Sequence, residues 1–310
     1  MFYASHVSPP SRSCESCPAD VRHIARQSLA EAIAWLERPS LSDRAVHAVR
    51  KDLKRVRAML RLMRPALRSD EYHHANATLR DVARSLSAAR DSKVLLDTLQ
   101  GLPGRSRASS EPAPERALRS HLQRDHAHSR DRLRADGASV RRASRSLRAI
   151  RRRLTQRPAS RYDRTVLSKG LQRVYGRTRA ALKRAQARHT VENLHELRKQ
   201  TKYLWHQLEA LADARTSEDR ALIAATHRLA DLLGDEHNLA VLQSTVLAAS
   251  MSASSRERLL ARIARRRGRL VANALVLAQR IYRDRPAALA KRVMGCATAR
   301  PGTPSVRSFS

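Results

Sequence analysis

The chain carries one short pattern twice, and this repeat constrains the fold more than any other feature. Residues 46–57 read VHAVRKDLKRVR, and residues 194–205 read LHELRKQTKYLW. At a constant separation of 148 residues, the matching pairs are His47 with His195, Arg50 with Arg198, Lys51 with Lys199, and Lys54 with Lys202. The repeat predicts a molecule built from two related halves, each presenting the same cationic surface.

Both copies have the spacing of an amphipathic helix. At about 100° per residue, the basic residues of the first copy span roughly 80°, beside the arc of its apolar residues. They are His47, Arg50, Lys54, Arg57 and Arg61. In the second copy Trp205 takes the place of Arg57. A basic stripe that borders a buried stripe is expected at a groove between packed helices, so we predict one shared basic groove. A solvated basic face is the alternative.

The charge of the chain indicates a polyanionic partner. The 310 residues include 62 Lys and Arg but only 28 Asp and Glu, which gives a formal net charge of +34. Such charge repels itself within a folded protein, so a partner of opposite charge is expected. Arginine forms forked hydrogen bonds to phosphate oxygens, whereas single-stranded nucleic acid is usually held by stacking on aromatic rings. Because aromatic residues make up only 3% of the chain, the composition favours phosphates over bases.

Helical periodicity predicts an all-α fold, and strand signals are nearly absent. The expected segments are a disordered N-terminus (1–18), a first half (about 19–100), a linker (about 101–114), a second half (about 115–285) and a disordered basic tail (286–310). The linker is indicated by its glycine and proline content. We therefore predict a duplicated helical bundle with two pseudo-symmetric halves of about four helices each.

Several classes of protein are disfavoured. Cys14 and Cys17 lack a second Cys or His pair at zinc-site spacing, and Cys296 stands alone. No apolar window approaches the roughly 20 residues of a transmembrane helix. The first twenty residues also lack the apolar core of a signal peptide. We therefore expect a cytoplasmic protein without a metal or a cofactor.

Two other predicted helices carry lines of cations. Arg141, Arg145, Arg148 and Arg152 follow the spacing of one helix face, and Lys169, Arg173, Arg177 and Arg184 form a looser line. If either line faces the groove, the site becomes a basic cavity rather than a strip. We accordingly include Arg145, Arg148, Arg173 and Arg177 among the candidate site residues, with a solvated face as the alternative for each line.

Further motifs occur in a fixed order along the chain. They are Arg90-Asp91 ahead of Val94-Leu95, Tyr175-x-Arg177-x-Arg179, and Leu233-Gly-Asp235-Glu-His237-Asn238. Together with the two His-x-x-Arg-x-x-x-Lys elements, they resemble the CHAD family, the conserved histidine α-helical domain, over about residues 18–285. The resemblance implies an all-helical bundle that binds inorganic polyphosphate and gathers on polyphosphate granules. Lys93 and Asn238 stand where the family usually has acids, which argues against a metal at those positions.

Polyphosphate binding without catalysis is the function we predict. The candidate residues are His47, Arg50, Lys51, Lys54, Arg57, Arg61, His195, Arg198, Lys199, Lys202, Arg145, Arg148, Arg173 and Arg177. The alternative is sequence-independent nucleic-acid binding, which the charge supports equally but which lacks aromatic platforms here. An enzyme is less favoured, because neither a P-loop nor a dense carboxylate cluster for Mg²⁺ is found.

Binding is expected to depend on pH through the two histidines. Phosphate favours the charged imidazolium, so affinity should rise as pH falls from about 8 toward 6. Arginine and lysine are expected to keep their charge throughout that window.

Overall fold

The computed structural model describes residues 21–102, 113–211 and 216–295. These residues form eleven α-helices, two short 3-10 helices and no strand. The helices are α1 (Val21–Leu36), α2 (Asp43–Met63), η1 (Arg64–Ala66), α3 (Ser69–Ser85), α4 (Ser87–Gln100), α5 (Ala113–Ala135), α6 (Gly137–Thr155), η2 (Ala159–Tyr162), α7 (Arg164–Ala187), α8 (Val191–Leu211), α9 (Ser217–Ala248), α10 (Ala253–Ile281) and α11 (Pro286–Met294). The predicted all-α fold is thus confirmed for this part of the chain. None of the described helices combines the length and apolar character needed to cross a bilayer.

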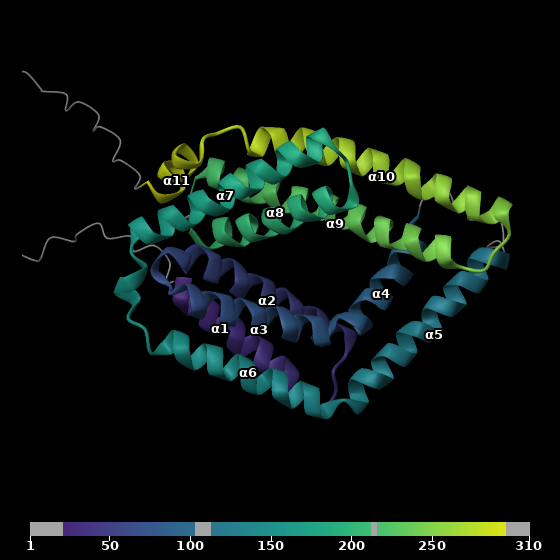
Figure 1. Ribbon diagram of the computed structural model, residues 1–310, viewed down its shortest axis with the longest axis horizontal. Coiled ribbons are helices and arrows are strands. Elements are labelled where there is room, and N and C mark those ends of the chain that lie inside the picture. The colour runs from purple at the N-terminus through teal and green to yellow at the C-terminus, as the bar shows by residue number, and fades with distance from the viewer. Residues whose placement is uncertain (1–20, 103–112, 212–215, 296–310) are drawn as a thin grey trace, which may run out of the picture.

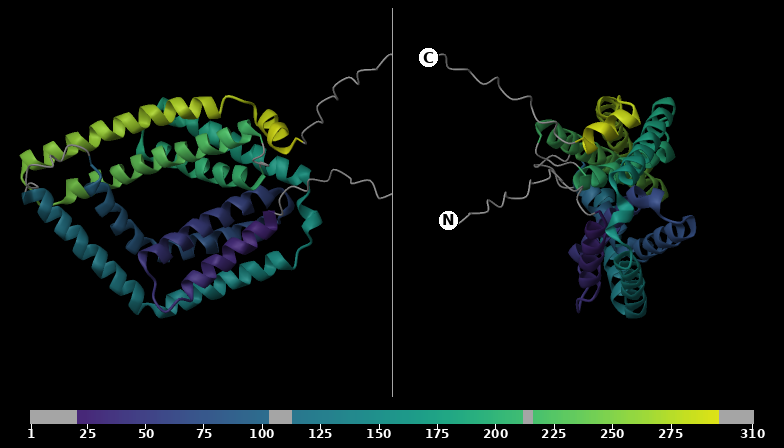
Figure 2. Two further views of the ribbon diagram at one scale, coloured as in Figure 1. Left: turned by 180° about the vertical axis from the view of Figure 1, so that it is seen from behind. Right: turned by 90° about the vertical axis from the view of Figure 1, so that its left-hand side faces the viewer.

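The helices form two groups, α1–α6 and α7–α11, that meet along α2 and α8 (Figure 1). Seen from the side, the two groups are stacked one above the other (Figure 2). Helix α2 packs against both α7 and α8, and α4 packs against α9. These contacts bring the two copies of the sequence repeat to the boundary between the groups.

The helix boundaries repeat at the separation seen in the sequence. Helix α8 begins and ends 148 residues after α2. Helix α9 begins 148 residues after α3 and ends 148 residues after α4, so it corresponds to those two helices together. The packing partners correspond as well. Helix α1 packs on α2 and α6, and its counterpart α7 packs on α8 and α11.

The boundary between the groups differs from the predicted one. Helices α5 and α6 were expected in the second half, but α5 packs mainly on α4, and α6 packs on α1 and α3. Residues 156–163 therefore connect the groups, and the predicted linker at about 101–114 joins two helices of one group. Composition indicates a loop, but a loop within a group and a linker between groups have the same composition.

The predicted disordered tail is wrong over its first nine residues. Pro286–Met294 forms α11, which packs on α7 and buries Leu289, Ala290, Val293 and Met294. Nine residues contain too few turns for a clear periodic signal. The remaining tail, the predicted disordered segment 1–18 and the three cysteines lie outside the described residues.

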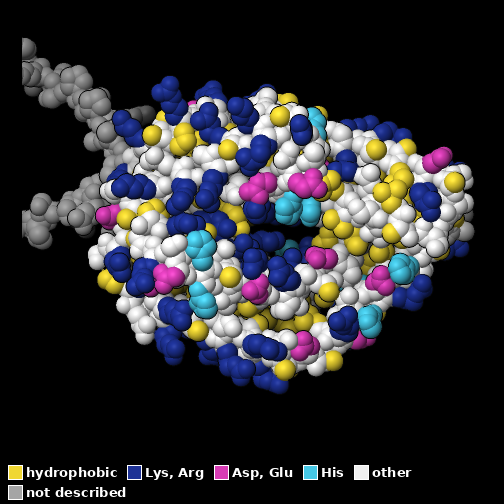
Figure 3. Space-filling view, in the orientation of Figure 1, with side chains coloured by type: hydrophobic (Ala, Val, Ile, Leu, Met, Phe, Trp, Pro, Cys, Tyr) yellow, Lys and Arg dark blue, Asp and Glu magenta, His cyan; other side chains and the backbone are white. Residues whose placement is uncertain are grey.

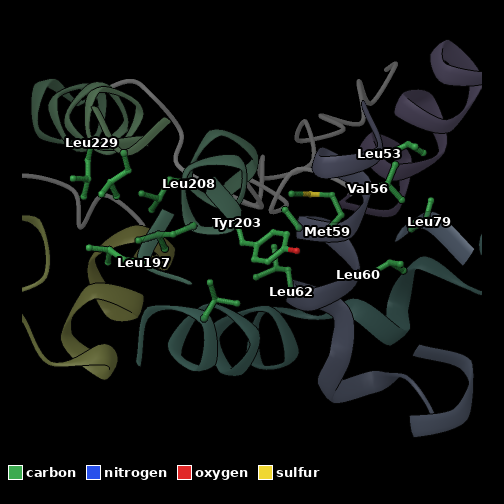
Figure 4. Packing of buried hydrophobic residues seen from close by; sticks show 14 of the residues in the cluster. Leu53, Val56, Met59, Leu60, Leu62, Leu79, Leu197, Tyr203, Leu208 and Leu229 are labelled. Carbon is green, nitrogen blue, oxygen red and sulfur yellow. The ribbon is translucent and has the colours of Figure 1, made fainter. Parts of the chain in front are cut away.

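One core runs through both groups. Tyr203 of α8 lies beside Leu62 of α2 among buried apolar side chains from both groups (Figure 4). Within this contact the Gln207 side-chain amide donates a hydrogen bond of 3.0 Å to the Ala58 carbonyl. Helix α7 approaches α2 most closely at Gly170, where a β-carbon would lie 2.0 Å from the Leu62 carbonyl oxygen. A larger residue at this position would therefore force α7 away from α2.

Replacing Gly170 by alanine is expected to destabilise the fold. The added methyl group would force α7 away from α2, and overpacking of this kind costs about 1–3 kcal/mol. Gly268→Ala is the matched control, because no neighbouring atom lies within 4 Å of its added carbon. That control should be neutral or slightly stabilising, since alanine is the better helix former. Urea unfolding measures both, and equal midpoints would show that α7 can shift without cost.

Candidate functional site

Helix α2 presents its cations at the edge of its buried face. The helix begins after Ser42, whose hydroxyl accepts a hydrogen bond of 3.2 Å from the Ala45 amide. Val49, Leu53 and Val56 are then fully buried in the core. The residues that follow them in the chain, Arg50, Lys54 and Arg57, lie roughly 100° further around the helix. They therefore border its buried face. The amphipathic spacing thus places the basic stripe next to the second group.

The cations of the two stripes meet at this boundary. We call their meeting point the central basic cluster and define it as His47, Arg50, Lys54, Arg90, His195, Arg198, Lys202 and His237. Lys54 of α2 is influenced electrostatically by Lys202 and Arg198 of α8. In the space-filling view, Lys, Arg and His side chains gather at a hollow near the centre of the molecule, with some Asp and Glu side chains at its rim (Figure 3). The structure therefore brings the two stripes into one site.

The two lysines of the cluster are strongly perturbed. Burial, followed by the neighbouring Lys202 and Arg198, lowers the pKa of Lys54 to about 7. Burial and Arg198 lower the pKa of Lys202 to about 8. Neither amine forms an ion pair or a hydrogen bond with a described residue. The expectation that lysines keep their charge between pH 6 and 8 is therefore wrong for these two.

The histidines of the cluster favour their neutral forms. The rings of His195 and His237 lie with their centroids 4.7 Å apart. Burial and then Arg198 lower the pKa of both, that of His237 to about 4. Burial and then Arg90 lower the pKa of His47. Since all three shifts disfavour the cation, a bound anion would reverse their direction.

The two arginines shared by the repeat differ in their partners. Arg50 donates a hydrogen bond of 2.6 Å to the Ala83 carbonyl and lies 3.8 Å from Asp91. Arg198 instead has a buried Nε–H without a partner among the described residues. Leaving a buried donor unpaired costs about 1–3 kcal/mol. An anionic ligand that reached Arg198 would recover part of that cost.

A second set of cations continues from the cluster. We call it the outer basic strip, formed by Arg57, Arg61, Arg64, Arg173 and Arg177. The side-chain oxygen Oδ1 of Asn76 accepts hydrogen bonds from Arg57 at 3.1 Å and from Arg61 at 3.0 Å. The Arg61 guanidinium also lies 3.9 Å from the centre of the Tyr203 ring. The strip is therefore held in place by polar and aromatic contacts.

The strip extends from α2 across η1 to α7. Arg64 stacks over the Tyr72 ring at 4.2 Å. After burial, Arg64 and Arg177 are the largest influences that lower the pKa of Arg173. This proximity places two of the predicted residues of α7 near the end of the basic stripe of α2. Both are exposed.

Other candidate residues lie at the rim of the cluster or away from it. Lys51 is exposed, and Lys199 forms an ion pair with Glu196. Arg145 and Arg148 are not brought to the cluster, because α6 packs on the far side of α1. Arg148 forms a forked ion pair with Glu37, at 2.6 and 2.8 Å. The helical spacing of the α6 arginines was correct, but the groove lies elsewhere.

Sequence reasoning omitted several cations near the site. Arg90 and His237 occupy corresponding places in the motifs that precede Val-Leu, 147 residues apart, and this correspondence could have identified them. Arg80 and Arg84 of α3 had no such signal. They line a cavity of about 220 Å³ together with Arg50, Lys54 and Arg57. In the described part of the chain, no group of three or more His, Cys, Asp or Glu residues is placed to hold a metal ion.

The structure describes an all-α protein with a half-buried cationic site between two groups of helices. A family model described as CHAD domain matches residues 21–247. The chain therefore belongs to the CHAD domain family.

Two solved structures are similar to this one. The crystal structure of the CHAD domain from the plant Ricinus communis has a TM-score of 0.50 and 18% identity, over 94% of this chain and 97% of that chain. PptA from Streptomyces chartreusis has a TM-score of 0.55 and 15% identity, over 86% of this chain and 100% of that chain. At these identities the likeness supports the fold. No match was found among curated proteins.

The perturbed lysines predict a pH-dependent stability. An unfolded chain holds lysine protons with a pKa near 10.5, whereas folded Lys54 and Lys202 release them near 7 and 8. Stability of the ligand-free protein should therefore be lost as pH falls from about 10 to 7, by a few kcal/mol. The double variant Lys54→Met, Lys202→Met should lose most of this dependence and unfold at a higher temperature at pH 7.

Thermal unfolding at pH 7 and 9.5 measures the effect. Lys183→Met with Lys291→Met is the matched control, because it removes two exposed charges. The control should keep the dependence of the unmodified protein. If both double variants respond to pH alike, the repulsion within the cluster does not limit stability.

Proposed function

We propose that this protein binds inorganic polyphosphate in the central basic cluster, and that it does so without catalysis. The observation that carries the proposal is that half-buried Lys54, Lys202 and Arg198 lie near one another, with no acid bonded to either lysine. Folding places these cations together against their mutual repulsion. A ligand of high negative charge density would offset that repulsion. Membership of the CHAD domain family supports the same ligand.

The chemistry of the site suits a chain of phosphates. Each phosphate unit carries about one charge and offers only oxygen acceptors, which match guanidinium and ammonium donors. Neutral His47 and His195 can each donate one hydrogen bond and gain a proton as the anion arrives. The outer basic strip offers further arginines in the direction of α7, so we infer that a long polymer extends along it.

Nucleic-acid binding remains the second candidate because of the net charge of +34. Two features count against it. The faces of Tyr72 and Tyr203 lie against Arg64 and Arg61, so they are occupied by guanidinium groups rather than open to bases. A duplex is also broad and rigid, with its phosphates on the outside. It would reach exposed arginines more readily than the buried Nε–H of Arg198.

We further propose that the protein acts in the cytoplasm on polyphosphate granules. A polymer with many phosphate units can hold many copies of a binding protein, so association with granules would follow from the binding itself. We propose no metal or cofactor for this activity.

Charge reversal within the cluster is expected to abolish tight polyphosphate binding. Arg50→Glu with Arg198→Glu should weaken it by about 100-fold or more, because each charge-assisted hydrogen bond contributes about 1.5–3 kcal/mol. The control, Arg152→Glu with Arg265→Glu, changes the net charge equally at exposed positions of α6 and α10. Competition between long-chain polyphosphate and duplex DNA, at matched phosphate concentration, measures both variants.

The control should retain its preference for polyphosphate over DNA. Circular dichroism should show unchanged helicity in both variants. Equal losses in the two double variants would mean that net charge, rather than a site, binds the polymer.

Polyphosphate binding is expected to tighten as pH falls from 8 to 6. The empty site lowers the pKa of His47, His195, Lys54 and Lys202. A bound polyanion raises all four, so binding takes up protons. His47→Gln with His195→Gln should remove only part of the slope of log affinity against pH, and adding Lys54→Arg with Lys202→Arg should remove most of the rest. A slope that survives in the quadruple variant would assign the effect to other groups.

A further inference from the structure

We propose that Lys54 is a carbamylation site, where the side-chain amine reacts reversibly with carbon dioxide and the surrounding guanidinium groups hold the resulting carbamate. The proposal rests first on a cavity that the Lys54 side chain lines together with arginines. Lys54 lines a space of about 220 Å³ whose other charged lining residues are Arg50, Arg57, Arg80 and Arg84. A small anion bonded to the lysine nitrogen would therefore have cationic donors around it.

The charged residues that line the cavity, and the charged groups that act most strongly on Lys54, are all cations. The charged groups that influence it are Lys202 and Arg198 of α8, with Arg50 and Arg90 of the first group. Asp81 forms ion pairs with Arg80 and Arg84, and Asp91 lies 3.8 Å from Arg50, but neither carboxylate lines the cavity. The Lys54 amine itself has no hydrogen bond or ion pair within the described residues. Negative charge at this nitrogen would thus be stabilised from both groups of helices.

The reaction balances without an oxidant or a metal. The lone pair of the neutral amine attacks the carbon of CO₂, a nitrogen–carbon bond forms, and one carbon–oxygen π pair moves onto oxygen. The nitrogen then loses a proton to solvent or to the neutral imidazole of His47. The products are a carbamate and one proton. A pKa of about 7 makes a large fraction of Lys54 neutral under ordinary conditions, as the attack requires.

Lys54 is better suited to this reaction than the other lysines near it. Lys51 is exposed, and Lys199 is paired with Glu196. Lys202 is the nearest competitor, but Asp231 and Asp235 both act on it. These carboxylates favour its ammonium form and would repel a carbamate. The geometry therefore selects one of the two buried amines.

The modification would oppose polyphosphate binding, and this consequence rests on the proposed function. A carbamate replaces a titratable cation with an anion inside the central basic cluster. It would take hydrogen bonds from Arg50 and its neighbours that the polymer otherwise uses. Carbon dioxide should therefore weaken polyphosphate binding, and polyphosphate should displace the carbamate.

The test uses the full chain in ¹³C-labelled bicarbonate near pH 7.5. Carbon-13 NMR should show a carbamate signal in addition to that of the terminal amine. The signal should disappear in Lys54→Arg, which keeps the charge but does not form a carbamate, and should remain in the matched control Lys51→Arg. Alkylative trapping followed by peptide mass spectrometry should place the added mass on Lys54 of the unmodified sequence, which needs no variant.

The proposal is overturned if no lysine carbamate forms, if the signal persists in Lys54→Arg, or if trapping labels only Lys202 or the terminal amine. A second arm adds saturating long-chain polyphosphate. Loss of the Lys54 signal would support competition within one site. A Lys54 carbamate that persists would contradict the competition and the proposed polyphosphate site while leaving the modification established.

Discussion

The contact between α2 and α8 is the interaction on which the rest of the structure depends. Apolar side chains from both helices fill it, and the amide of Gln207 bonds to the backbone of Ala58 within it. The same contact brings two basic stripes together. Burial of apolar surface is additive over many residues, so it can offset the repulsion between a few cations. The packing of the core therefore holds these cations close together despite their repulsion.

That origin explains the state of the ligand-free site. Burial disfavours the charged forms of these groups, and like charges that cannot separate also reduce their repulsion by losing protons. Lys54, Lys202 and the three histidines all have lowered pKa values for this reason. Arginine cannot release its proton in this range, so Arg198 stays charged with an unpaired Nε–H. The clustered cations destabilise the folded protein. A polyanion that binds them stabilises the folded state and offsets this cost.

The local sequence pattern was sufficient to predict the helices, but not to predict which helices form each group. The amphipathic spacing in α2 and α8 identified both, and their boundaries follow the predicted separation of 148 residues. The sequence does not show which helices pack against each other, so α5 and α6 were assigned to the wrong half. Helix α11 was missed because nine residues carry little periodic signal. Grouping depends on which apolar faces meet, and many faces in this chain are similar.

The sequence by itself determined the helical periods, the repeat and the residue types that border each buried face. It therefore identified His47, Arg50 and Lys54 as a stripe. Only the tertiary structure decided that this stripe faces its counterpart on α8, while α6 packs on α1 and its Arg148 pairs with Glu37. Only the tertiary structure set the pKa of Lys54, because that value depends on burial and on cations far away in the chain. Helical spacing fixes angles within one helix, whereas the electrostatics of a site depend on distances between helices.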